Sequence, residues 1–287
     1  MLSEEELEEF ENYLIKSYNL EPSTAQVYRT KVRIFFRFIQ KSPDELEIPD
    51  LLRFFEWQYD NGISASTMNT YMSSIRAYLD YLIYTGYLER NVAREFRRRF
   101  KTPKRLPEVM TVEEMEKMIL APLKYQKNEK RAEWEAAVMT VLSTSGIRLS
   151  ELFSLNKNRV DIEKRMIRVI GKRNKEREIP IITKWFKSID VLAFYEYLFY
   201  GEGAKYKRSP ITIYRFIVKY GKKLFPKRHI TPHTFRHSFC TALIKDGVPL
   251  HIVRDIMGHR SIYITELYLH LAKKDVIEEL RKVGAID

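Results

Sequence analysis

Four stretches of this chain carry side chains that suit chemistry on a phosphate group. Arg148 lies in Thr-Ser-Gly-Ile-Arg-Leu-Ser-Glu-Leu, at a turn that leads into a helix. His233 and Arg236 are three residues apart in Thr-Pro-His-Thr-Phe-Arg-His, so they share one face of a helix. His259 lies in Met-Gly-His-Arg-Ser, and Tyr268 follows nine residues later.

Cleavage of a phosphodiester by a side chain has three requirements. The negative charge on the phosphate must be neutralised, the nucleophile must lose a proton, and the leaving oxygen must gain one. Arg148 and Arg236 suit the first task, because guanidinium groups stay charged and donate paired N–H groups to phosphate oxygens. A free phenol has a pKa near 10, so only about one in a thousand is ionised at pH 7. His233 suits proton transfer at the tyrosine, because the pKa of histidine lies near neutral pH.

None of these spacings is specific when taken alone. The chain has six histidines and 18 tyrosines, and a second His-x-x-Arg occurs at His251 and Arg254. Tyr263, four residues after His259, competes with Tyr268 for the role of nucleophile. The order and the context of the motifs together carry the prediction.

The elements that position these residues are predicted to be mainly helical, with one small antiparallel sheet. The spacing of apolar residues predicts helices in the first part of the chain over 4–18, 23–39, 50–59 and 64–84. Later helices are predicted from the capping box at 111–114 onward and over 129–143, 149–155, 183–200, 210–223, 233–246, 249–257 and 273–283. Residues 166–170 and 177–182 are predicted to form two strands joined by a basic loop.

The composition divides the chain into two lobes. Residues 1–95 hold 10 basic and 16 acidic residues, a formal charge of −6, whereas the rest holds 40 and 22, a charge of +18. Such a basic surface favours a polyanionic partner. We predict a helical N-terminal domain over 1–93, a basic linker with two prolines over 94–107, and a catalytic domain over 108–287.

Several other classes of protein are disfavoured. No apolar run is long enough to span a membrane, and the N-terminus lacks the features of a signal peptide, so we expect a cytoplasmic protein. Cys240 is the single cysteine and is expected to be a buried small residue. The chain has no zinc-ligand spacing and no Walker loop, so no metal or nucleotide cofactor is expected.

Taken in this order, the motifs resemble those of the tyrosine recombinase (phage integrase) family, most closely its Xer-type members. The resemblance covers nearly the whole chain. The family's catalytic set falls on six positions of this sequence: Arg148, Lys172, His233, Arg236, His259 and Tyr268. Glu151 matches a common acidic supporting position.

The resemblance implies a SAM-like helical core-binding domain and a catalytic domain that bind a specific site on double-stranded DNA. It implies cleavage and rejoining through a 3′-phosphotyrosyl intermediate on Tyr268 and a Holliday junction, within a homotetramer assembled on DNA from free monomers or dimers. Lys172 would protonate the leaving 5′ oxygen, and His259 would hydrogen-bond a phosphate oxygen. The Xer type implies resolution of chromosome or plasmid dimers, and the C-terminal helix over 273–283 would dock on a neighbouring subunit or within its own domain.

The sequence departs from the family pattern in three places. Met257 replaces the usual leucine before Gly-His, and Arg173 occupies the middle of the hairpin loop, which leaves Lys175 as an alternative to Lys172. Tyr263 lies where the family usually has threonine. A viral or plasmid integrase, a type IB topoisomerase and, in a different class, a non-catalytic DNA-binding protein remain alternative interpretations.

Overall fold

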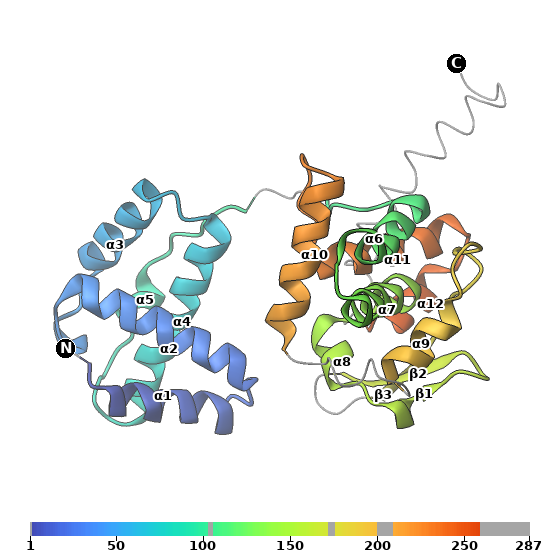
Figure 1. Ribbon diagram of the computed structural model, residues 1–287. Coiled ribbons are helices and arrows are strands. Elements are labelled where there is room, and N and C mark those ends of the chain that lie inside the picture. The colour runs from blue at the N-terminus through green and yellow to red at the C-terminus, as the bar shows by residue number, and fades with distance from the viewer. Residues whose placement is uncertain (1, 103–105, 172–175, 200–208, 259–287) are drawn as a thin grey trace, which may run out of the picture. The chain divides into compact units, whose positions relative to one another are not determined.

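The computed structural model describes residues 2–102, 106–171, 176–199 and 209–258. By its internal contacts the chain divides into two compact units, Met1–Lys104 and Arg105–Asp287 (Figure 1). Each unit has its own hydrophobic core, so each is described by itself. No helix of the described ranges is both long and apolar enough to cross a membrane.

The first unit consists of short helices joined by tight turns. Its elements are α1 (Glu4–Lys16), α2 (Pro22–Ile39), η1 (Pro43–Glu45), α3 (Ile48–Asp60), α4 (Ala65–Tyr84) and α5 (Val92–Glu95). The side chains of Ser3 and Ser64 accept hydrogen bonds from the first turns of α1 and α4 and so fix where these helices begin. The four long helices lie where the apolar spacing predicts them.

Aromatic rings hold this unit together. Phe35 and Phe54 meet edge to face at 5.0 Å between ring centroids, and Phe10 meets Tyr78 in the same way at 5.1 Å. Phe100, which the sequence places in the linker, packs on Phe55 with its ring centroid 4.8 Å away. The chain after α5 therefore stays attached to the first unit for several residues, because Phe96 is buried and Phe100 partly buried against Phe55 of α3.

The second unit packs helices around one central helix. Its elements are α6 (Val112–Tyr125), α7 (Glu129–Ser145), α8 (Leu149–Ser154), η2 (Lys157–Arg159), β1 (Val160–Asp161), β2 (Met166–Ile170), β3 (Glu176–Pro180), α9 (Val191–Phe199), α10 (Pro210–Leu224), α11 (Pro232–Lys245) and α12 (Leu250–Met257). Helix α7 is buried on nearly all sides and contacts α6, α9, α10 and α11 (Figure 1). Such burial explains why its sequence lacks a polar face.

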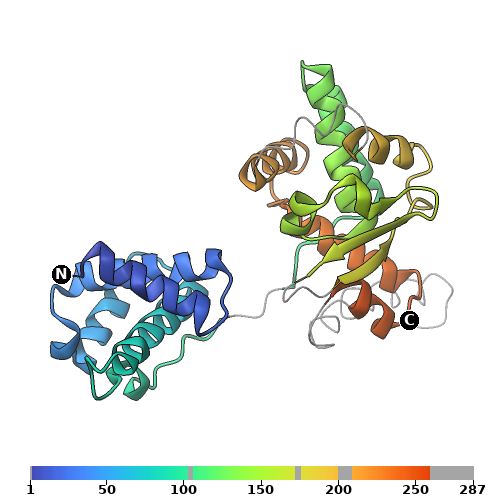
Figure 2. The same ribbon diagram turned by 90° about the horizontal axis from the view of Figure 1, so that it is seen from below.

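The three strands form one antiparallel sheet in the order β1-β2-β3, and they lie side by side in Figure 2. Ile167 pairs with Ile179 and Val169 pairs with Arg177. Residues that are paired directly point to the same face, and Ile167, Val169 and Ile179 bury that face in the core. The predicted fold class, mainly helical with a small antiparallel sheet, is confirmed.

Three elements of the second unit differ from the sequence-based expectation, and the first is η2, a single turn that was not predicted. The two-residue strand β1 was not predicted, since its pattern is too short to detect. The helix predicted over 183–200 begins only at Val191, because Asp190 accepts a hydrogen bond from the backbone N–H of Ala193 and caps it there. The helix predicted over 273–283 lies outside the described residues.

Candidate active site

Arg148 is held at the sharp turn between α7 and α8. Gly146 ends α7 with a left-handed φ of 60°, and a Cβ atom there would overlap the ring of Phe239. Arg148 is then the N-cap of α8, and its Nη1 donates a 2.8 Å hydrogen bond to Oε1 of Glu151. The backbone N–H of Arg148 donates to Oε2 of the same carboxylate at 2.8 Å.

The first turn of α11 carries His233 and Arg236. Thr231 caps this helix and Pro232 occupies its first position, so the helix begins directly before His233. Arg236 is only 4% exposed, and its guanidinium donates to the carbonyl of Gly146 at 2.7 Å and to that of Met257. The first hydrogen bond ties α11 to the turn that carries Arg148, and the second ties it to the end of α12.

His233 keeps an exposed edge beside these cations. Partial desolvation lowers the pKa of His233, and the positive charges of Arg236 and Arg148 lower it further. Both effects favour the neutral imidazole, which is the form that is able to accept a proton. The pKa of His237, one turn along α11, falls to about 4 because of burial and the nearby His233 and Arg236.

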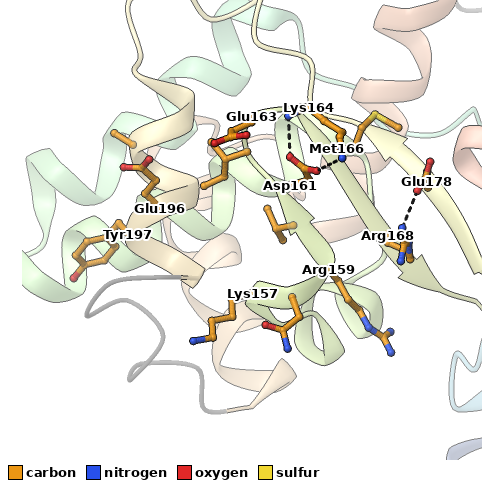
Figure 3. A pocket seen from close by; sticks show the side chains of 14 residues that line it. Lys157, Arg159, Asp161, Glu163, Lys164, Met166, Arg168, Glu178, Glu196 and Tyr197 are labelled. Carbon is orange, nitrogen blue, oxygen red and sulfur yellow. Dashed lines mark hydrogen bonds and ion pairs between the residues drawn. The ribbon is translucent and has the colours of Figure 1, made fainter.

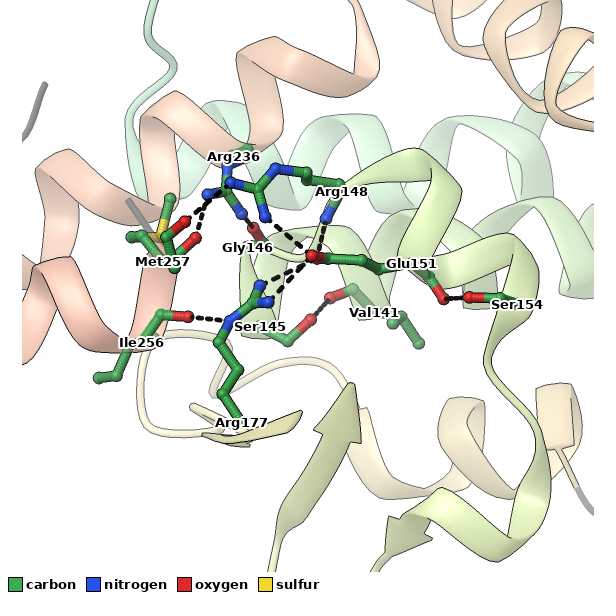
Figure 4. Close-up of polar contacts among 11 residues, drawn as sticks. Val141, Ser145, Gly146, Arg148, Glu151, Ser154, Arg177, Arg236, Ile256 and Met257 are labelled. Carbon is green, nitrogen blue, oxygen red and sulfur yellow. Dashed lines mark hydrogen bonds and ion pairs between the residues drawn. The ribbon is translucent and has the colours of Figure 1, made fainter. Parts of the chain in front are cut away.

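Glu151 connects the site to the sheet. It is 5% exposed, and each of its carboxylate oxygens accepts one hydrogen bond from Arg148 and one from Arg177 of β3 (Figure 4). Burial alone would raise the pKa of Glu151, but the hydrogen bonds and charges of the two arginines outweigh it and lower the pKa to about 2. Glu151 is therefore ionised at any working pH.

The C-terminal end of α12 closes the site. Three consecutive carbonyls accept hydrogen bonds from three different arginines: Ile256 from Arg177 at 2.9 Å, Met257 from Arg236, and Gly258 from Arg148 at 3.1 Å (Figure 4). These carbonyls have no partner inside the helix, and they carry the negative end of its dipole. Three cations from β3, α11 and the turn before α8 satisfy them.

The structure thus brings together four of the residues that the sequence singles out: Arg148, Glu151, His233 and Arg236. The candidate residues Lys172, His259 and Tyr268, with the alternatives Lys175 and Tyr263, lie outside the described residues. Residues 259–287, which include His259 and Tyr268, follow directly after Gly258 in the sequence. The carbonyl of Gly258 accepts a hydrogen bond from Arg148.

Arg177 is the residue of this site that the sequence analysis missed. The alternation of β3 carried a signal, because Arg177 lies two residues before Ile179 and so shares its buried face. A cation on the apolar face of a strand requires a buried acceptor. That acceptor is Glu151, which the sequence analysis considered only as a supporting residue.

A wide cavity of about 1130 Å³ lies elsewhere in the second unit, between the β1–β2 region and α9 (Figure 3). Its charged side chains are partly paired, Lys164 with Asp161 at 3.1 Å and Arg168 with Glu178 at 3.2 Å. None of the four described site residues lines it. Across the described ranges, no group of three or more His, Cys, Asp or Glu side chains is arranged to hold a metal ion.

Comparison with known proteins identifies the family of this chain. The model of the Phage integrase family matches residues 108–275, and that of the Phage integrase N-terminal SAM-like domain matches residues 7–86. The tyrosine recombinase XerC of Thermodesulfovibrio yellowstonii is 29% identical over 268 residues, which cover 89% of this chain and 88% of the relative. The tyrosine recombinase XerD of Chlorobaculum tepidum is 28% identical over 290 residues, which cover 96% and 94%.

A solved structure shares the fold. The XerH site-specific recombinase, bound to a palindromic difH substrate in a post-cleavage complex, matches with a TM-score of 0.71 at 17% identity, over 95% of this chain and 83% of that one. The chain belongs to the phage integrase family, the tyrosine recombinases. It is an enzyme of that family, and its relatives are Xer recombinases.

Proposed function

We propose that this chain recombines DNA at a specific site, cleaving and rejoining strands through a 3′-phosphotyrosyl intermediate on Tyr268 and a Holliday junction. One observation carries the proposal: Arg148 and Arg236 converge on two adjacent carbonyls at the end of α12, close to His233, whose pKa they lower. Two convergent guanidinium groups suit the two non-bridging oxygens of a phosphodiester. By analogy with its Xer relatives, the reaction resolves dimers of chromosomes or plasmids.

Each residue takes one part of the reaction. Arg148 and Arg236 stabilise the charge that develops on the phosphate, and His233 receives the proton of the attacking tyrosine. The phenolate oxygen of Tyr268 then forms a bond to phosphorus, and the 5′ oxygen leaves with a proton from Lys172. A 5′ hydroxyl of the partner strand reverses these steps and releases the tyrosine. His259 donates a hydrogen bond to a phosphate oxygen.

Double-stranded DNA is the partner that the charge favours. Helix α10 exposes a face that carries Tyr214, Arg215, Lys219 and Lys222 at helical spacing, which suits a phosphate backbone. We propose residues 1–93 as the core-binding domain, 94–107 as a linker and 108–287 as the catalytic domain. A homotetramer would assemble on DNA in the cytoplasm. Lambda integrase has been solved as a tetramer bound to a Holliday junction.

The test is covalent trapping on DNA. Wild-type protein is mixed with a randomised duplex pool that carries a nick, and the duplexes that become attached to protein under denaturing conditions are sequenced. Tyr268→Phe should bind the selected duplex with unchanged affinity and form no adduct, whereas Tyr263→Phe should form adduct at the wild-type rate.

Two results contradict the proposal in different ways. If Tyr268→Phe forms the adduct and Tyr263→Phe does not, the nucleophile is Tyr263 and the assignment to Tyr268 is wrong. If the wild-type protein binds the duplex but forms no adduct, the result favours a non-catalytic DNA-binding protein.

A further inference from the structure

Arg177 uses every side of its guanidinium group. Nη1 and Nη2 donate to the two carboxylate oxygens of Glu151 at 2.9 Å each, and Nε donates to the carbonyl of Ile256 at 2.9 Å. The side chain is 14% exposed, so these contacts are largely shielded from water. One residue of β3 therefore binds both the residue that holds Arg148 and the end of α12.

A second arginine–glutamate pair of the same sheet lacks these features. Arg168 of β2 and Glu178 of β3 are 3.2 Å apart, and both side chains are more than half exposed. Neither contacts Arg148, Arg236 or α12 through a hydrogen bond that the structure shows. Exposed pairs of this kind contribute little to stability, so this pair provides a matched control.

We propose that Arg177 is a positioning residue for strand cleavage, an inference that rests on the proposed function. Through Glu151 it fixes the orientation of the Arg148 guanidinium. Through the carbonyl of Ile256 it fixes the end of α12, from which the chain continues to His259. Arg177 lies on β3, the strand that follows the loop containing Lys172 in the sequence. Its side chain therefore connects β3 to Glu151 and to the end of α12.

The geometry explains why an arginine is required. Glu151 accepts four hydrogen bonds, two from Arg148 and two from Arg177. Without Arg177 the carboxylate is free to turn about its remaining partner, and Arg148 turns with it. A lysine keeps the charge but has a single nitrogen, so it does not reproduce a fork to Glu151 together with a bond to Ile256.

The position of Gly258 supports the same reading. A Cβ atom at Gly258 would lie 3.0 Å from Cζ of Arg177 and 3.1 Å from its Nε and Nη1. The backbone of this residue therefore lies directly against the guanidinium. The end of α12 therefore contacts Arg177 through packing as well as through the carbonyl of Ile256.

The experiment measures single-turnover cleavage of the nicked duplex selected by wild-type protein, at saturating protein. We expect Arg177→Met to cleave about 10- to 100-fold more slowly with the same affinity for the duplex, the loss that a small misplacement of catalytic groups causes. Arg177→Lys should recover part of the rate. Arg168→Met should cleave at the wild-type rate.

A double-mutant cycle separates positioning from a general loss of structure. If Arg177 acts through Glu151, Arg177→Met combined with Glu151→Gln should be no more than about threefold slower than the slower single variant. Independent structural effects would multiply instead, and that result overturns the inference. If Arg177→Met gives no cooperative unfolding transition, the cycle is run with Arg177→Lys.

The remaining outcomes are also decisive. Wild-type adduct together with an undiminished rate for Arg177→Met refutes this inference and leaves the proposed function standing. Absence of adduct with wild type refutes the proposed function, and this inference falls with it.

Discussion

Replacing three glycines of the second unit by alanine should destabilise that unit to different degrees. Gly146, Gly247 and Gly258 all have a left-handed backbone, with φ of 60°, 80° and 61°. They differ in what a new Cβ atom would meet. Nothing lies within 4 Å of it at Gly247, the guanidinium of Arg177 lies 3.0 Å away at Gly258, and a buried phenyl ring overlaps it at Gly146.

The magnitudes follow from these contacts. A left-handed conformation costs an L-residue about 1 to 2 kcal/mol, and Gly247→Ala should lose that amount alone. Gly258→Ala should add about 0.5 to 1.5 kcal/mol, because the end of Arg177 shifts and weakens a hydrogen bond. Gly146→Ala should add about 1 to 3 kcal/mol, because Phe239 is fully buried and has no free space to enter.

Equilibrium unfolding in urea measures the differences, with tryptophan fluorescence as the signal. A Trp57→Phe background leaves Trp134 and Trp185, both in the second unit. The ring of Trp185 lies 5.5 Å from that of Phe239, so its near-ultraviolet circular dichroism should change in Gly146→Ala and stay unchanged in Gly247→Ala. Equal losses of unfolding free energy in Gly146→Ala and Gly247→Ala would refute the reasoning.

Three further predictions concern the chemistry. Lys172→Ala should slow cleavage of ordinary DNA, and a 5′-bridging phosphorothiolate substrate, whose leaving group hardly needs a proton, should restore much of the rate. The same substrate should rescue Arg148→Ala to a smaller degree. Rescue of Lys175→Ala alone would show that Lys175, and not Lys172, is the acid. Cleavage should persist in excess EDTA, because the arginines supply the positive charge; loss with chelator and recovery with magnesium would contradict this. Folding lowers the pKa of Glu151 from 4.5 to about 2, so the stability that its ionised form contributes is fully present above about pH 4.5 and is lost as the pH falls towards 2. The difference in unfolding free energy between wild type and Glu151→Gln should therefore shrink by about 3 kcal/mol over that range, and a constant difference in acid titrations would show that Glu151 is not held by its arginines.

The sequence allowed the long helices and the central motifs to be predicted because both depend on local patterns. Apolar residues at helical spacing give α1, α2 and α4, and the proline after Thr231 marks the start of α11. The order of Arg148, His233 and Arg236 indicated one site, and the structure brings these three together. Lys172, His259 and Tyr268 stay predictions.

What the sequence did not reveal depends on contacts between distant segments. Arg177 looks like one of several cations in a basic hairpin; its spacing from Ile179 indicated a core-facing position, and the pairing of β2 with β3 establishes it. The hydrogen bonds of α12 to three arginines join residues up to 110 positions apart. No local pattern reports such contacts. The late start of α9 had a signal, Asp190, which competed with the apolar residues on both sides of it.

The origin of the arginine site in distant segments has a consequence for synthesis on the ribosome. The core of the first unit is complete once residue 96 has emerged, since all of its buried residues lie between Leu7 and Phe96. The contact of Arg148 with Gly258 needs about 160 further residues, roughly 10 to 30 s at ordinary rates of translation. During that interval the core of the first unit can be complete, while Arg148 and Arg236, which we propose to bind phosphate, do not yet have their shared contact with the end of α12.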